Sequence, residues 1–138
     1  MATGLRIGPI FYKIGTGSLL HSFFSTIAYR LEDNKWGSKF PFLMNELYQG
    51  DLSLENIPKA KKELNEIRAL FREYAPDRII WDIDDLKQQA PWGKNIAETI
   101  TSLSNYFITS DGRQFFDVFE KALQTGIDIQ KPIRIQSL

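Results

Sequence analysis

The sequence predicts an α+β fold, with a single mainly antiparallel sheet of about four strands packed against three to four helices. In several segments apolar residues recur at three- and four-residue spacing, and in others they alternate with polar residues. No linker or low-complexity tract separates the two kinds of segment. The 138 residues, 43% of them hydrophobic and 25% charged, fit one domain over residues 1–138 that buries roughly two-thirds of its unfolded surface.

The N-terminal part predicts one strand and one helix. Residues 5–14 alternate in the manner of a strand, and Pro9, which donates no ladder hydrogen bond, indicates an edge or a bulge. After a glycine-rich turn, Ser18 is a suitable N-cap for a helix that runs to about residue 32. Its apolar residues predict a buried stripe, formed by Leu20, Phe23, Phe24, Ile27 and Leu31.

The middle of the chain predicts two further helices. A short apolar helix is expected over residues 41–50, opened by a proline at its first position. A long, polar helix over residues 56–74 follows. Asn56 is the better N-cap for it, because a cap there places Pro58 in the first turn, where no backbone N–H is required.

The C-terminal part predicts three strands and one helix. Residues 77–83 have the pattern of a mostly buried strand, and residues 103–109 that of another. A loop over residues 86–98 joins them. A helix is expected from Ser110 to about residue 124, with Phe115, Phe116, Phe119 and Leu123 as its stripe and Gly126 as its C′ residue. Residues 127–135 then alternate as a strand with one wet face.

Composition excludes several classes of function. Lys and Arg equal Asp and Glu at 17 each, which does not support direct binding of nucleic acid, since that requires a basic face. No stretch approaches the ~20 apolar residues of a membrane span, and the N-terminus has no secretion-signal pattern. We therefore expect a cytoplasmic protein that does not enter a membrane, and no motif indicates a cofactor.

Catalytic candidates are few. There is no Cys and a single histidine, His21, which we expect on the exposed side of its helix without a partner. Asp77, with Asp85 and Lys87, imitates the motif of a magnesium-dependent nuclease. If residues 77–83 form an unbroken strand, however, the two carboxylates lie about 26 Å apart, too far to share one metal ion.

An acidic cluster next to the predicted strand is the strongest candidate site. Asp82, Asp84 and Asp85 lie within four residues, and Trp92 follows in the next loop. Trp36 is the other loop tryptophan that precedes a glycine. These residues predict a partner-binding surface, because interface hot spots favour aromatic residues and complementary charge. The alternative is a small metal-binding domain or hydrolase that uses the carboxylates of residues 82–85.

Short segments spread along the chain carry a resemblance to one family. They are His21-Ser22-Phe23-Phe24-Ser25-Thr26-Ile27, Gly37-Ser38-Lys39-Phe40-Pro41, Met44-Asn45-Glu46-Leu47-Tyr48, Ile80-Trp81-Asp82-Ile83, Pro91-Trp92-Gly93, Asn105-Tyr106-Phe107 and Thr109-Ser110-Asp111-Gly112. Together they resemble immunity protein family 70 of bacterial polymorphic toxin systems. The resemblance implies an intracellular antitoxin without catalysis. Its implied partner is a cognate secreted toxin, often one with a C-terminal nuclease domain.

Overall fold

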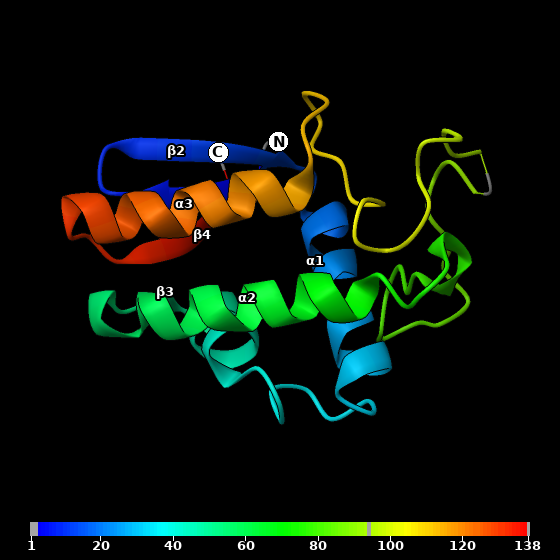
Figure 1. Cartoon of the computed structure of the whole chain (residues 1–138), viewed down its shortest axis with the longest axis horizontal. Coiled ribbons are helices and arrows are strands. Elements are labelled where there is room, and N and C mark those ends of the chain that lie inside the picture. The colour runs from blue at the N-terminus through cyan, green and yellow to red at the C-terminus, as the bar shows by residue number, and fades with distance from the viewer. Residues whose placement is uncertain (1–2, 94, 138) are drawn as a thin grey trace.

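The computed structural model describes residues 3–93 and 95–137 and contains one four-stranded antiparallel sheet (Figure 1). The strands are β1 (Thr3–Ile7), β2 (Ile10–Gly15), β3 (Asp51–Leu52) and β4 (Ile133–Ser137), in the order β2-β1-β4-β3. Thr3 of β1 faces Ser137 of β4, so the two ends of the chain lie side by side. The predicted α+β fold class is confirmed.

The predicted first strand is a hairpin of two strands. Ile7 faces Ile10 across a turn at Gly8 and Pro9. Gly8 has a φ of +56°, a conformation that glycine adopts at little cost and that the first central residue of a type II′ hairpin turn requires. The prediction of one continuous strand was wrong because the alternating pattern continues through this turn.

The first helix confirms the predicted stripe but begins earlier than predicted. In α1 (Gly17–Thr26), the hydroxyl of Thr16 accepts a hydrogen bond from the Leu19 N–H at 3.1 Å, so Thr16 and not Ser18 is the N-cap. A π-helical turn, η1 (Ile27–Leu31), continues the helix. The helix expected over residues 41–50 is present as the π-helical segment η2 (Phe42–Leu47) with flanking α-helical residues.

Two long helices pack against each other, and the second of them covers the sheet. A single 3₁₀ turn, η3 (Leu54–Asn56), leads into α2 (Ile57–Phe71), and Asn56 occupies the N-cap position, as predicted. Helix α3 (Phe115–Ile129) packs on α2 and on strands β1, β2 and β4. Gly126 is not a C′ residue but lies inside α3, where a Cβ would approach the Ile57 side chain to 2.8 Å. The C-cap is Gln130, in the left-handed region.

The core is built largely from phenylalanine. Phe23 of α1 is fully buried at its centre, and six further phenylalanine rings have centroids within 6.3 Å of its own: Phe24, Phe71, Phe107, Phe115, Phe116 and Phe119. Helix α1 therefore joins α2, α3 and the segment around Phe107 in one aromatic cluster.

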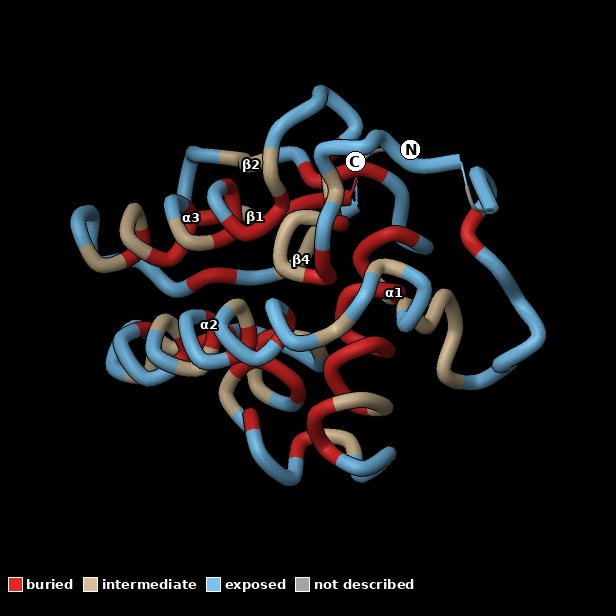
Figure 2. The backbone as a smooth tube through the Cα atoms, turned by 45° about the vertical axis from the view of Figure 1, so that its right-hand side comes forward, coloured by how far each residue is buried: buried red, intermediate tan, exposed pale blue. Residues whose placement is uncertain are grey.

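Residues 76–93 and 95–108 form an irregular segment on the side of α1 that faces away from the sheet (Figure 1). Apart from the 3₁₀ turn η4 (Pro76–Arg78), the described residues contain no helix or strand in this range, so the strands predicted at 77–83 and 103–109 are wrong. Only Ile108 forms an isolated bridge, with Gln114. The predicted loop over residues 86–98 is present and mostly exposed (Figure 2).

In the described ranges no helix is both long and apolar enough to cross a membrane.

Candidate functional site

The irregular segment is held by the hydroxyl-bearing side of α1. Ser22 donates to the Ile80 carbonyl at 2.9 Å, and the Thr26 hydroxyl accepts from the Ile80 N–H at 3.1 Å. The Ser25 hydroxyl accepts from the Ile83 N–H at 3.2 Å. These bonds satisfy backbone groups that a neighbouring strand would otherwise pair. The segment therefore runs along a helix, although its alternating side chains are typical of a strand.

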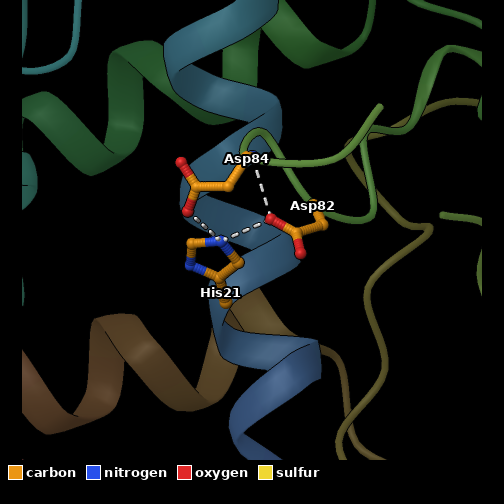
Figure 3. Close-up of side chains that lie close together, drawn as sticks. All are labelled: His21, Asp82 and Asp84. Atoms are coloured by element: carbon orange, nitrogen blue, oxygen red, sulfur yellow. Dashed lines mark hydrogen bonds and ion pairs between the residues drawn. The ribbon is translucent and has the colours of Figure 1, made fainter. Parts of the chain in front are cut away.

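His21 is the residue that sequence reasoning placed wrongly. It is half-buried, and its Nδ1 lies 2.6 Å from the Tyr48 hydroxyl while its Nε2 lies 3.1 Å from Asp82 Oδ1 (Figure 3). One neutral tautomer satisfies both contacts, with Tyr48 donating to Nδ1 and Nε2 donating to Asp82. The expectation of an exposed histidine without a partner is corrected: His21 links α1, η2 and the acidic cluster.

The acidic residues divide into one structural and two accessible groups. Asp82 is half-buried, and its Oδ1 also accepts from the Asp84 N–H at 2.9 Å, which fixes the turn. The side chain of Asp84 is 84% exposed, and its Oδ2 lies 3.8 Å from His21 Nε2. Asp85 is exposed and caps its own turn through the Lys87 N–H. Asp84 and Asp85 are thus the charges that a partner can reach.

A hollow of about 350 Å³ lies beside this cluster. His21, Asp82 and Asp85 line it together with the N-terminal residues of α1 and with Trp81 and Gln88. Burial, and then the carboxylates of Asp84 and Asp82, raise the pKa of the nearby Tyr48 phenol. Because the carboxylates of Asp82 and Asp85 line the hollow, it is an electronegative concavity.

The two loop tryptophans occupy different environments. Trp36 is half-buried, donates to the Met44 carbonyl at 2.7 Å and stacks on His21 with ring centroids 6.4 Å apart. Trp92 remains 38% exposed, although it packs edge-on against Trp81 and donates to the Tyr106 hydroxyl at 2.7 Å. Trp92 is a fixed aromatic ring at the surface, whereas Trp36 supports His21 from behind.

The buried carboxylate of Glu32 shapes the loop that carries Trp36. It is 2% exposed and accepts the N–H groups of Gly37, Lys39 and Phe40 at 2.9 to 3.0 Å. Gly37 has a φ of +81°, and a Cβ there would lie 2.2 Å from the Asn45 side chain. The loop sequence Gly37-Ser38-Lys39-Phe40 is therefore suited to wrapping around one carboxylate.

Among the described residues, His21, Asp82 and Asp84 are the group whose ligand atoms lie close enough to hold a metal ion, within 4.8 Å of one another. One imidazole nitrogen with carboxylate oxygens is a set that zinc or manganese accepts. The hydrogen bonds of His21 and Asp82 already satisfy the atoms concerned, so the cluster does not by itself indicate a metal. The predicted separation of about 26 Å between Asp77 and Asp85 assumed a strand over residues 77–83; the structure has no strand there, so that separation does not apply.

Comparison with known proteins identifies the family. The model of the family Immunity protein 70 matches residues 5–135, which is most of the chain. This chain belongs to the immunity protein 70 family. The match includes α1, the acidic cluster and both loop tryptophans, so every residue of the candidate site lies within the family domain. No significant match was found among curated proteins or among solved structures.

Proposed function

We propose that this immunity protein 70 family member neutralises a cognate secreted toxin inside the producing cell by forming a stoichiometric complex with it. The observation that carries the proposal is the family match over residues 5–135. An immunity protein acts by binding, and binding requires an accessible surface with recognisable chemistry. The exposed carboxylates of Asp84 and Asp85, beside an electronegative hollow, supply one.

We further propose that the target is the toxin's C-terminal nuclease domain. A nuclease needs a basic cleft to bind its polyanionic substrate, and an acidic surface complements such a cleft. The proposed contact residues are Asp84 and Asp85, with Trp92 as an aromatic anchor. Asp82 and Trp36 support this surface from behind, through the contacts that both make with His21.

Co-purification tests the proposal. The chain is expressed together with a candidate toxin domain, sought among the genes that neighbour its own, and only the toxin domain carries a tag. We expect a complex with a 1:1 mass by light scattering, and loss of toxin activity when the chain is added back to free toxin. Two separate peaks on gel filtration, together with full toxin activity, would reject the proposal.

Charge removal should change the association rate. The double variant Asp84→Asn, Asp85→Asn is expected to associate more slowly and with a flatter salt dependence, because both charges lie within the ~8 Å screening length of a bound partner. The matched control is Asp33→Asn, Asp128→Asn, which removes two exposed charges elsewhere. Surface plasmon resonance at several salt concentrations measures both rates. Equal slowing in the two double variants would assign the effect to net charge and not to this surface.

Removal of the anchor should change the dissociation rate. Trp92→Ala is expected to weaken binding by about 2 kcal/mol or more, mostly through faster dissociation. The same variant loses the hydrogen bond to Tyr106, so circular dichroism must confirm that it is folded. An unchanged dissociation rate in a folded Trp92→Ala protein would show that Trp92 is not part of the interface.

A further inference from the structure

A second concavity, of about 450 Å³, opens in the irregular segment next to the acidic hollow. Its apolar lining comes from Ile79, Trp81, Leu86, Ala90, Ile96 and Tyr106. We call this concavity the apolar groove. Its volume lies within the range of roughly 300–1,000 Å³ typical of pockets that bind a small molecule or cofactor, so it has room for one bulky apolar side chain.

The wall of the apolar groove is rigid. The rings of Trp81 and Trp92 meet edge to face with centroids 5.4 Å apart, and Trp92 is hydrogen-bonded to Tyr106. Tyr106 packs edge-on against Phe107, which is part of the aromatic core. Because the wall is tied to the core, little conformational entropy remains to be lost when a partner binds.

Apolar exposure is concentrated at this groove. Seven large hydrophobic side chains of the described residues are exposed, and three of them, Leu86, Trp92 and Ile96, lie within eleven residues of sequence. Leu86 is the most exposed of the seven at 56%. Leu86 and Ile96 line the groove itself. A concentration of this kind on one segment is typical of an interaction site, whereas single exposed hydrophobic residues are not.

Charge beside the groove indicates the chemistry of the partner. The groove and the acidic hollow share Trp81 and Gln88 as lining residues, so Asp85 lies in the adjoining concavity. Asp77 lines the groove itself. Among the described residues Asp77 forms an ion pair with Arg78, at 3.9 Å, and because both side chains are largely exposed this pair neutralises little of the charge on Asp77. A group seated in the apolar groove thus has the carboxylates of Asp77 and Asp85 near it.

We propose that the apolar groove receives an apolar side chain of the cognate toxin domain, one flanked by lysine or arginine that lies against Asp77 and Asp85. This inference rests on the proposed function and adds the chemistry of the toxin segment that is recognised. The apolar side chain supplies the buried anchor of the interface, and the flanking cations supply its orientation.

The test measures binding to a catalytically inactive variant of the candidate toxin domain that is used for co-purification. The groove variant is Leu86→Ser, Ile96→Ser, and the matched control is Leu70→Ser, Ile129→Ser, which changes one leucine and one isoleucine, each 38% exposed, outside the groove. We expect the dissociation rate to rise at least tenfold for the groove variant and less than twofold for the control. Thermal melts verify folding, which exposed side chains such as Leu86 should affect little.

Charge reversal tests the flanking cations separately. Asp77→Lys with Asp85→Lys should lower the association rate at least tenfold at low salt, because it places like charges opposite the toxin's cations. An unchanged association rate would refute the proposal that lysine or arginine of the toxin lies against Asp77 and Asp85.

Three outcomes would overturn the inference or separate it from the proposed function. If the wild-type chain binds the toxin domain and the groove variant binds it equally well, the groove is not the contact site, while the proposed function stands. Absence of wild-type binding rejects both. A wild-type dimer by sedimentation that the groove variant converts to a monomer assigns the groove to a second copy of this chain and rejects the toxin as its occupant.

Discussion

Replacing Glu32 by Gln should destabilise the protein markedly. Glu32 ends the π-helical turn η1, and its carboxylate accepts three backbone N–H groups from the loop that follows: those of Gly37, Lys39 and Phe40. A glutamine fits the same volume but presents an amide NH₂ where the second carboxylate oxygen lay. At least one buried N–H then faces another donor.

The magnitude follows from the number of bonds affected. Hydrogen bonds to a charged acceptor contribute about 1.5–3 kcal/mol each, and a buried donor left without a partner costs about 1–3 kcal/mol. Glutamine retains one acceptor oxygen, so only part of the stabilisation from the three hydrogen bonds is lost. We expect Glu32→Gln to lower the free energy of unfolding by about 3 kcal/mol. For a domain of this size the corresponding fall in Tm is roughly 10 °C.

Urea and thermal denaturation followed by circular dichroism measure this change. Glu73→Gln, at an exposed position beyond α2, is the matched control and should change stability by less than about 0.5 kcal/mol. A loss below about 1 kcal/mol in Glu32→Gln would show that the carboxylate does not organise the loop.

Three further predictions concern the core, a helix cap and the histidine. Phe23→Ala removes the ring at the centre of the aromatic cluster, so the free energy of unfolding should fall by about 3–5 kcal/mol in urea denaturation; a fall below about 1 kcal/mol would contradict this position. Burial raises the pKa of Glu63 to about 7, although the N–H groups of Phe42 and Leu43 oppose that shift. With a folded-state pKa above the unfolded value of 4.5, this group's stabilisation is complete below pH 4.5 and is lost as pH rises through about 7. Because Glu63 is only half-buried, the loss is on the order of 1 kcal/mol, and Glu63→Gln should flatten stability across that window; an unchanged pH profile would refute the assignment. His21→Ala removes two hydrogen bonds and should lower the free energy of unfolding by about 1–2 kcal/mol. A fluorescence-detected thermal melt identical to that of the wild type would show that these contacts of His21 do not stabilise the fold.

The helices could be predicted because their burial follows directly from spacing. Every member of the stripe predicted for α1, from Leu20 to Leu31, is buried in the structure. The cap at Asn56 was also predictable, since a proline two residues later restricts where α2 can begin. Local rules of this kind depend on residues a few positions apart, all of which are visible in one sequence.

The segment at 77–83 could not be predicted because its partner is distant in sequence. Its alternating pattern is typical of a strand, but its hydrogen bonds go to hydroxyls of α1, more than fifty residues earlier. Polar residues opposite an apolar stripe ordinarily predict an exposed face, so nothing in the sequence indicates that Ser22, Ser25 and Thr26 are buried beneath this segment.

The candidate site was predictable in its charges but not in its geometry. Asp82, Asp84 and Asp85 are neighbours in sequence, so their cluster is evident without a structure. The contact of His21 with Asp82 spans 61 residues and depends on the path of the irregular segment. For the same reason sequence reasoning could not distinguish the supporting Trp36 from the exposed Trp92.

A titration of toxin activity tests whether this immunity protein 70 family member neutralises a toxin by stoichiometric binding, as proposed above. Purified toxin domain is held at a fixed concentration well above the Kd of the complex, and its activity is measured as the chain is added. We expect a linear fall in activity that reaches zero at one molar equivalent. Full activity in the presence of a large excess of folded chain would reject the proposal.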